Sequence, residues 1–492
     1  MESLRAVKRT FETPFTLELD GSGDPLDLRK VLRVVPGRRA VFSGRWMERK
    51  VAAKLFFRPH RFRRHLRRET AGIRALQRAG VPAPEILFAG KAKNSACGVL
   101  VSRYLEGPTP LTDLWTGKFD PDQRLRLLKV LARLIAQMHR HGLFQRDLHP
   151  GNFLVSGDRI YSVDGSAIRV RSSTRPLNAR ASLSNLASLF SLSKFRDPLL
   201  VRELYTTYCN ARGWGKNEER YLALENTIRA YRRRGVRKYL RKIFRNSTEI
   251  VCRRSFRRLL LCRRTRFSLR METFLESPDT LLKRPETKRV KIGNTSTVSL
   301  VRIDDRLLAV KRYNIKGISH GVKRCLRRTR AAHSWRNAHR LIKMGIETPG
   351  PVAMVEKRLG PFRAEAFYIS EYVSGPLAET YFADGAGHTK VEDARRITEL
   401  LGTLESDRIS HGDLKASNII VREEGPVLLD LDAMREHRIR KLFEAAHRKD
   451  LSRFFLNWKH YPRVEALFRG LILDREIGLH AGVGKLLKHA EN

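Results

Sequence analysis

The chain has 492 residues, 41% of them hydrophobic, which is enough for two or more domains that each bury a core. Lys and Arg number 98 against 51 Asp and Glu, so the formal net charge is +47 and polyanionic partners are expected. The five cysteines are odd in number and form no Cys-x-x-Cys pair, which argues against a disulfide framework or a zinc site. We expect neither a signal peptide nor a membrane-spanning helix, because no run of about 18 uncharged apolar residues occurs.

The first half of the chain alternates strand-like and helix-like segments. Residues 29–57 predict a strand, a turn and a strand that ends in KVAAKLFF, and residues 61–80 predict a helix. A further strand is expected at 98–107 and an amphipathic helix at 121–142. The polar segment QRDLHPGN, residues 145–152, follows that helix directly.

The second half repeats this order. The pattern predicts a hairpin over 298–313, a helix over 328–345 and a strand over 366–375. A helix over 391–409 then precedes HGDLKASN, residues 411–418. The repetition indicates that the chain contains the same type of domain twice.

The two polar segments share a spacing, Asp-x4-Asn-x11-Asp. In a kinase fold this spacing puts one carboxylate at the acceptor hydroxyl and an Asn–Asp pair on magnesium. We therefore predict two catalytic aspartates, Asp147 and Asp413. The predicted magnesium ligands are Asn152, Asp164, Asn418 and Asp430, with Asp432 as an alternative to Asp430. Each residue alone could serve as a cap or turn residue, but the doubled pattern makes chance a poor explanation.

The predicted fold is α+β, with two tandem protein-kinase-like domains, each with a small β-rich N-terminal lobe and a mainly helical C-terminal lobe. We assign residues 1–255 to the first domain, 256–285 to a linker and 286–492 to the second domain. Because the chain ends soon after Asn418, the second domain is expected to have a reduced C-terminal lobe.

Two lysines stand where a central strand would direct a cation at nucleotide phosphates: Lys54 in VAAK and Lys311 in LAVK. Each follows a glycine, Gly37 or Gly293, at a distance that leaves room for a loop over the phosphates. Neither loop has the G-x-G-x-x-G pattern, so each lysine alone could be an ordinary residue at the end of a strand.

A helix carboxylate usually orients such a lysine. Glu69 lies eleven residues before Gly80 and is well placed, although it could instead be a solvated charge beside a neighbouring arginine. The matching position before Gly345 is Ser334, so the ion pair is expected to be missing from the second copy.

Other polar residues near the two motifs are expected to be structural. His411 precedes the second motif's Asp by two residues, where the first copy has Gln145, and His149 flanks the first motif. Asn185 and Asp450 follow at similar distances; each could tie the backbone of its motif to a helix or cap that helix.

Three basic runs, at 58–68, 229–245 and 253–266, carry aromatic or leucine residues among their arginines. On helices they would form cationic amphipathic faces suited to an anionic membrane surface. The charge would equally suit RNA, and solvated helix faces are the simplest alternative.

The phrases HGDLKASNIIV, LLDLDAMR, VKRYN, SWRNAHRL, SEYVSG and HRKDLSRFFLNW resemble the bacterial lipopolysaccharide core kinases over residues 290–460. The first half, with VAAKLF, ETAGIRAL and FQRDLHPGNFLV, is similar to the same broad group. The resemblance implies ATP, Mg²⁺ and phosphorylation of an inner-core sugar of a lipopolysaccharide core precursor, with a heptose as the expected acceptor. It also implies a peripheral position at the cytoplasmic face of the inner membrane and makes nucleic acid an unexpected partner.

The resemblance assigns the nucleotide-binding roles to Lys54, Glu69 and Lys311. The pattern departs at Ser334 and at Gly165-Ser166, which follow Asp164 in place of an aromatic residue and a glycine. One copy could therefore be an inactive pseudokinase, and the chain as a whole a scaffold for core assembly. A kinase for a small cationic acceptor is a further alternative, against which the basic composition argues.

Overall fold

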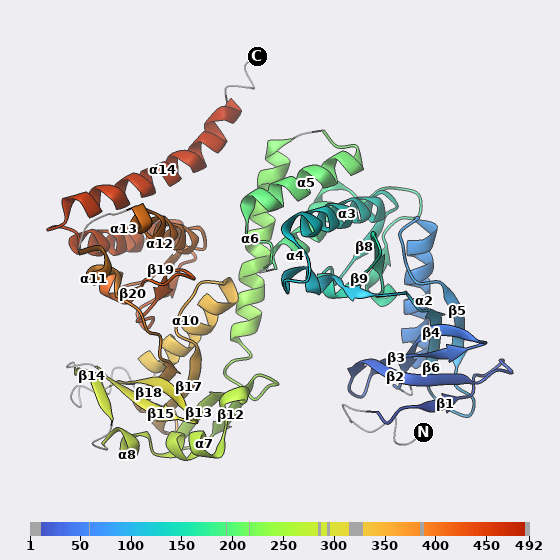
Figure 1. Ribbon diagram of the computed structural model, residues 1–492, viewed down its shortest axis with the longest axis horizontal. Coiled ribbons are helices and arrows are strands. Elements are labelled where there is room, and N and C mark those ends of the chain that lie inside the picture. The colour runs from blue at the N-terminus through green and yellow to red at the C-terminus, as the bar shows by residue number, and fades with distance from the viewer. Residues whose placement is uncertain are drawn as a thin grey trace. The chain divides into compact units, whose positions relative to one another are not determined.

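The computed structural model describes residues 11–58, 60–192, 194–215, 217–283, 287–292, 296–313, 328–383 and 388–487. It is a mixed α/β structure with several antiparallel sheets (Figure 1). The chain divides into two compact units, Met1–Arg232 (unit 1) and Arg233–Asn492 (unit 2). The division lies within helix α6 (Glu218–Leu240) and therefore precedes the segment 256–285 that we predicted as a linker.

Unit 1 begins with a six-stranded antiparallel sheet in the order β1-β2-β3-β4-β6-β5. Its strands are β1 (Phe15–Leu17), β2 (Leu26–Val35), β3 (Arg39–Trp46), β4 (Arg49–Phe56), β5 (Ile86–Lys91) and β6 (Gly98–Arg103). The segment 29–57 thus contains three strands where two were predicted. The missed turn is at Met47 and Glu48, which adopt positive φ without glycine. Gly37, with φ 64°, makes the β2–β3 turn.

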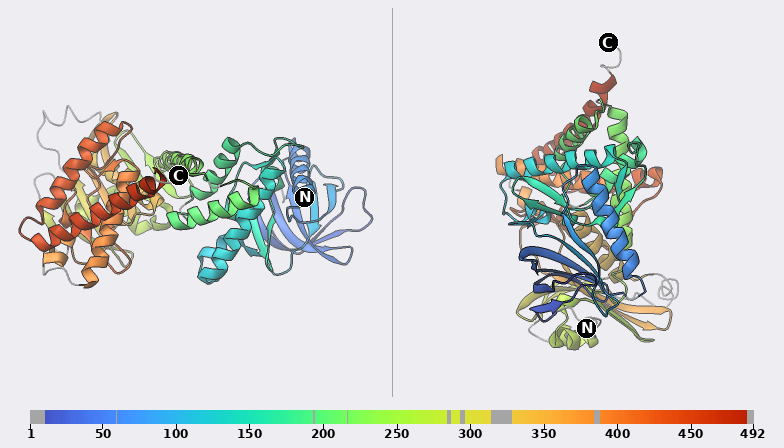
Figure 2. Two further views of the ribbon diagram at one scale, coloured as in Figure 1. Left: turned by 90° about the horizontal axis from the view of Figure 1, so that it is seen from above. Right: turned by 90° about the vertical axis from the view of Figure 1, so that its right-hand side faces the viewer.

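Helix α2 (Phe62–Arg78) corresponds to the predicted helix at 61–80 and lies along the sheet (Figure 2). Its buried face includes Phe62, Ile73 and Leu76, at the helical spacing that an amphipathic segment requires. Phe62 and Ile73 pack with Leu100 of β6, and this packing fixes the helix against the strand next to β4.

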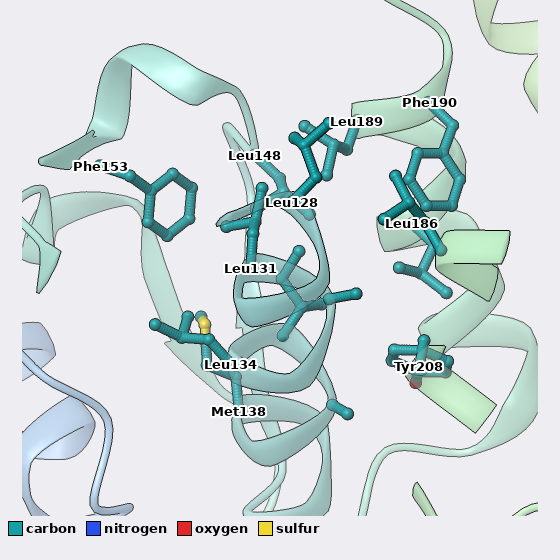
Figure 3. Packing of buried hydrophobic residues seen from close by; sticks show 14 of the residues in the cluster. Leu128, Leu131, Leu134, Met138, Leu148, Phe153, Leu186, Leu189, Phe190 and Tyr208 are labelled. Carbon is teal, nitrogen blue, oxygen red and sulfur yellow. The ribbon is translucent and has the colours of Figure 1, made fainter. Parts of the chain in front are cut away.

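The rest of unit 1 is mainly helical. Its helices are α3 (Pro121–Arg140), α4 (Ala179–Phe190), α5 (Pro198–Arg212) and the first part of α6. Four of the five residues predicted to form the apolar face of α3 are buried, namely Leu128, Leu131, Ile135 and Met138, and the fifth, Leu125, is half-buried. Figure 3 shows these leucines and Met138 packed with Phe153, Phe190 and Tyr208.

Short strand pairs stand at the C-terminal end of α3. Strand β8 (Leu143–Gln145) pairs with β11 (Ile168–Val170), and β9 (Phe153–Ser156) pairs with β10 (Arg159–Ser162). The segment QRDLHPGN runs from β8 to the short helix η2 (Pro150–Asn152) and is therefore held at both ends.

Unit 2 has a seven-stranded antiparallel sheet in the order β12-β13-β17-β18-β16-β15-β14. Its strands are β12 (Ile250–Arg254), β13 (Arg258–Arg263), β14 (Lys288–Ile292), β15 (Ser296–Ile303), β16 (Arg306–Tyr313), β17 (Pro351–Leu359) and β18 (Phe362–Glu371). The predicted hairpin over 298–313 is confirmed as β15 and β16.

Much of the segment predicted as a linker belongs to the core of unit 2. Alternate residues of β13 are buried on opposite faces of the sheet. Leu260 packs on the side of α7 (Leu269–Glu276), and Leu261 packs on the side of Trp335 in α10 (Arg330–Met344). The apolar residues LLLC are flanked by arginines, and these hid the buried strand in the sequence. Long basic side chains can lie at the ends of a buried strand.

The helical part of unit 2 repeats the order seen in unit 1. It comprises α11 (Ala378–Ala383), α12 (His388–Ser406), α13 (Arg440–Leu456) and α14 (Pro462–Leu487). Strand β19 (Ile409–Ser410) pairs with β22 (Arg435–Glu436), and β20 (Ile419–Ile420) pairs with β21 (Val427–Leu428). Among the residues that the structure describes, no helix is both long and apolar enough to cross a bilayer.

Candidate functional site

The first polar motif is fixed by hydrogen bonds from its asparagine. Asn152 Nδ2 donates to the carbonyl oxygen of Asp147 at 2.7 Å, and Val163 N donates to Asn152 O at 3.0 Å. Since Asp164 follows Val163, these bonds connect all three residues of the motif. The Asp147 side chain is 73% exposed and its Oδ2 lies 3.5 Å from His149 Nε2. Its carboxylate is therefore open to a substrate.

Lys54 forms the predicted ion pair with the helix glutamate. Its Nζ lies 2.6 Å from Glu69 Oε1, and the Glu69 side chain is fully buried. Glu69 Oε1 also accepts from Gly165 N at 3.1 Å, so it links the lysine to the segment after Asp164. Glu69 Oε2 has no hydrogen-bond partner among the described residues. A buried carboxylate with this arrangement requires a cation beside it, which orients Lys54.

Asp164 is held in its ionised form. Burial opposes its ionisation, but the charge of Lys54, the hydroxyl of Ser166 and the charge of Arg39 together lower the pKa of the carboxyl below its ordinary value. Ser166 Oγ donates to Asp164 Oδ1 at 2.7 Å, and Arg39 Nη2 lies 3.8 Å from Oδ2. The carboxylate is thus available for a metal ion at neutral pH.

Gly165 is required by close packing between α2 and the segment after Asp164. A Cβ atom on Gly165 would lie 2.2 Å from Glu69 O, and one on Gly72 would lie 1.9 Å from Gly165 O. No side chain fits at either position. The departure from the family pattern at Gly165 therefore has a structural reason, because it brings Gly165 N to the Glu69 carboxylate.

The second motif repeats the hydrogen bonds of the first. Asn418 Nδ2 donates to Asp413 O at 2.9 Å, and Leu429 N donates to Asn418 O at 2.8 Å. Asp430 follows Leu429, as Asp164 follows Val163. The Asp413 carboxylate lies 3.1 Å from Lys415 Nζ. The two polar motifs thus have the same backbone-to-side-chain architecture.

The lysine of unit 2 has different partners. Lys311 Nζ lies 2.5 Å from Asp430 Oδ1 and 3.3 Å from Asp432 Oδ2, and Arg330 Nη2 lies 2.8 Å from Asp432 Oδ2. Burial opposes ionisation of Asp430, but Lys311 lowers the pKa of this carboxyl below its ordinary value. A predicted metal ligand is here neutralised directly by the predicted phosphate-binding lysine.

The absence of a helix carboxylate explains this difference. Ser334 Oγ is hydrogen-bonded to Tyr313 Oη at 2.8 Å, as expected for a position that has lost its ion pair. Farther along α10, Asn337 Nδ2 donates to the carbonyl oxygens of Leu431 and Met434 at 2.8 and 3.0 Å. Helix α10 thus holds the segment after Asp430 through an amide instead of a carboxylate.

Each motif is also tied to a helix behind it, as one of the two sequence interpretations proposed. Asn185 Nδ2 donates to Gln145 O at 2.7 Å, while Gln145 N donates to Asn185 Oδ1 at 3.2 Å. In unit 2, Asp450 accepts from His411 N at 2.6 Å and from Gly412 N at 2.9 Å. Both residues are buried and neither serves as an N-cap.

The residue two positions before the motif aspartate differs between the units, and the structural role expected for His411 agrees with its contacts. His411 Nε2 donates to Leu429 O at 2.9 Å and connects the motif to the Asp430 segment. Gln145 is fully buried, and neither atom of its amide group finds a hydrogen-bond partner in the described part of the chain. Glutamine therefore does not reproduce the bond that histidine makes in unit 2.

The oxygen atoms at both motifs suit magnesium. Because Asn152 Nδ2 is engaged with Asp147 O, its Oδ1 is the amide atom left for a cation beside Asp164. Asn418 has the same arrangement. The described residues contain no group of three or more His, Cys, Asp or Glu that could hold a metal by itself. An Asn–Asp pair fits Mg²⁺ nonetheless, which commonly takes one or two protein ligands and completes its shell with phosphates and water.

Comparison with known proteins agrees with this geometry. Residues 34–198 and, separately, 273–463 match the model of the lipopolysaccharide kinase (Kdo/WaaP) family, and together they cover most of the chain. The chain belongs to the lipopolysaccharide kinase (Kdo/WaaP) family. The resemblance found in the sequence is thereby confirmed, and membership supports a kinase that acts on lipopolysaccharide. No curated protein matches the chain.

Several residues of the two sites were not anticipated from the sequence. They are Arg39, Gly72 and His139 in unit 1, and Arg330 and Asn337 in unit 2; the ring of His139 is hydrogen-bonded through Nε2 to Asn185 Oδ1 at 3.0 Å. Asn337 lies within SWRNAHRL, and its place three residues after Ser334, on the same helical face, could have suggested it. Gly293, expected to begin the phosphate loop of the second copy, lies outside the described residues.

Proposed function

We propose that the protein transfers a phosphoryl group from ATP to a hydroxyl of an inner-core sugar of lipopolysaccharide, and that this sugar is a heptose. The observation that carries this proposal is the joint presence, in unit 1, of the Lys54–Glu69 pair and the Asn152–Asp147 bond. Family membership supports the class of reaction and the class of substrate.

The two units are further proposed to be tandem protein-kinase-like domains that meet within α6. The repeated order of sheet, helix, helix and polar motif supports this, as do the two separate family matches. The second domain would then begin with β12 and β13 and would include the segment that the sequence suggested as a linker.

Unit 1 is proposed to carry the transfer. Bound MgATP would supply the phosphoryl group, with the metal neutralising part of its charge. Lys54, oriented by Glu69, would bind the nucleotide phosphates, and Asn152 Oδ1 and the Asp164 carboxylate would hold the metal. Asp147 would orient the acceptor hydroxyl and receive its proton as the oxygen attacks.

Unit 2 is proposed to have a reduced catalytic role or none. Lys311 already neutralises Asp430, and Ser334 offers no carboxylate that could draw the lysine away. A metal ion at Asp430 would have to displace this ion pair. The alternative of an inactive pseudokinase, which the sequence left open, is thus supported for unit 2. It is not proposed for the whole chain.

Attachment to an anionic membrane surface is proposed as the way the enzyme meets its lipid-linked substrate. Exposed arginines of α2 support it: Arg63, Arg64, Arg67, Arg68 and Arg74. None has a carboxylate within 4.0 Å among the described residues, so their charge is free for lipid phosphates. Sedimentation with phosphatidylglycerol vesicles should weaken as salt rises, because exposed charges are screened over about 8 Å at physiological ionic strength. Release by RNase instead of salt would favour RNA as the partner.

The test of the reaction is mass spectrometry of core oligosaccharide from cells that lack the protein, complemented with variants. Asp147→Asn should abolish phosphorylation, while Asp413→Asn should leave it nearly intact. Both variants should keep wild-type affinity for ATP in calorimetry. If core phosphate is unchanged even in the double variant, the kinase proposal is wrong and a scaffold role is favoured.

A further inference from the structure

Unit 2 contains a cavity of about 740 Å³ on the side of α10 that bears His333 and Arg336. Its wall is formed by the last part of α6 and residues just after it, by α10 and Arg328 before it, and by residues within 434–438. None of the residues given catalytic or metal-binding roles lines it. Seven arginines line the cavity: Arg237, Arg241, Arg328, Arg336, Arg340, Arg435 and Arg438. The volume is within the range typical of sites for small molecules of nucleotide or sugar-phosphate size.

The charge of this wall is not balanced by the protein. Glu436 is its one carboxylate, and it pairs with Arg237 at 2.9 Å and with Arg340 at 3.2 Å. The other five arginines have no carboxylate within 4.0 Å in the described part of the chain. Guanidinium groups around one cavity repel one another, so an anion in it would be strongly favoured.

The titration of the lining groups is consistent with this crowding. Burial lowers the pKa of Arg336, and the neighbouring charge of Arg328 lowers it further. Burial also lowers the pKa of His333, with further contributions from Arg328, Arg435 and Arg336 that outweigh the opposite effect of Asp432. The imidazole therefore stays mostly neutral at pH 7 and can donate or accept a hydrogen bond.

Part of the cavity is preorganised. Arg340 is only 5% exposed, and its guanidinium donates to Asn337 Oδ1 at 3.1 Å and to Glu436. Its Nε–H is buried and has no partner among the described residues. At another part of the wall, Arg328 lies over the ring of Phe244, 5.2 Å from its centroid. The position of one lining guanidinium is thus fixed by the protein before any ligand binds.

We propose that this cavity binds a small ligand that carries two or more phosphate groups. Arginine binds phosphate with two parallel N–H···O bonds, and several guanidiniums around one cavity can hold several such groups. The site is separate from the residues proposed for phosphoryl transfer, so this proposal goes beyond the proposed function and does not depend on it.

The test is calorimetry of the full chain with inorganic tripolyphosphate in the absence of magnesium. The variants are Arg241→Gln and Arg435→Gln, whose side chains are exposed and can be changed without loss of packing. Each should weaken binding about tenfold, because a hydrogen bond between charged groups is lost. The matched control is Arg302→Gln, which removes the same charge from an exposed position of β15 outside the cavity. Tripolyphosphate that binds at the nucleotide sites would bind equally to every variant. The difference between the variants therefore reports binding in the cavity alone.

A second arm distinguishes a free ligand from a lipid-linked one. Phosphatidylcholine vesicles that contain diphosphorylated lipid A are compared with phosphatidylglycerol vesicles of equal charge. If the protein prefers the lipid A vesicles, and Arg241→Gln loses this preference while Arg302→Gln keeps it, the ligand is lipid-linked. If Arg241→Gln loses only the binding of tripolyphosphate, the ligand is soluble. The proposal is overturned if wild-type protein binds neither probe, or if the cavity variants bind both as the control does.

Discussion

Lys54 and Glu69 form an ion pair of 2.6 Å in which the carboxylate is fully buried, whereas the equivalent lysine of unit 2, Lys311, is paired with Asp430. In both units the motif asparagine donates to the carbonyl oxygen of the motif aspartate and accepts from the residue before the second aspartate. The difference between the units therefore lies in what orients the lysine. In unit 1 the partner belongs to a helix, and Asp164 remains available as a ligand.

Glu69→Gln should lower the affinity for ATP and the rate of transfer together. The amide can still accept a hydrogen bond, but it no longer attracts the Lys54 ammonium. A hydrogen bond between charged groups is worth about 1.5–3 kcal/mol, so we expect a loss of roughly ten- to a hundredfold in kcat/KM for ATP. Steady-state kinetics at varied ATP concentration measures this loss in kcat/KM. The control is Ser334→Ala at the equivalent position of unit 2, which should have wild-type kinetics; equal losses in both variants would contradict the assignment of catalysis to unit 1.

Asp450→Asn should loosen the second motif without unfolding the unit. Asp450 is 3% exposed and accepts the backbone N–H groups of both His411 and Gly412. A neutral amide offers one acceptor in place of two, so the local stability should fall by about 2 kcal/mol. Hydrogen exchange of the amides in residues 409–414 should accelerate accordingly. Asp474→Asn, at an exposed position of α14, is the control and should leave this exchange unchanged.

The motifs were predictable because their information is local. Asp147 and Asn152 are five positions apart, and the bond between them forms within one loop, so the spacing alone encodes it. The pairing of Lys311 with Asp430 joins residues 119 positions apart and depends on how α10 packs, which no local pattern records. Strand β13 was missed for a related reason: its flanking arginines mask an apolar run whose burial is decided by β17.

Unit 1 should lose stability as the pH falls from about 6.5 to about 4, owing to His139. Burial lowers the pKa of His139 to about 4, and the ring is enclosed between Tyr208 Oη at 2.8 Å and Asn185 Oδ1 at 3.0 Å. Since the unfolded histidine has its ordinary pKa near 6.5, the unfolded state binds more protons in this range and stability rises with pH. The stability that unit 1 gains from keeping His139 neutral is fully present above about pH 6.5.

The expected size is about 2 kcal/mol between pH 7 and pH 5, from a shift of about 1.4 kcal/mol per pH unit below 6.5. Urea unfolding of wild type and His139→Gln at both pH values measures it. Their difference isolates this residue from His339, whose pKa burial lowers to about 3. If the variant loses as much stability on acidification as wild type, His139 is not the group responsible.

Gly72→Ala should disturb both the stability and the activity of unit 1. The added methyl carbon would lie 1.9 Å from Gly165 O, a backbone atom that cannot rotate away, so α2 must shift. Overpacking of this kind costs about 1–3 kcal/mol. The shift would also lengthen the bond from Gly165 N to Glu69 Oε1, now 3.1 Å, and weaken the orientation of Lys54. We therefore expect a lower melting temperature together with a lower rate of transfer.

Gly235→Ala provides the matched control, because a Cβ at this position of α6 meets nothing within 4 Å. That variant should gain about 0.5–1 kcal/mol, since alanine favours a helix over glycine. Thermal unfolding and the transfer assay on both variants decide the matter: if Gly72→Ala retains wild-type stability and rate, the close contact between α2 and Gly165 does not position the Lys54–Glu69 pair.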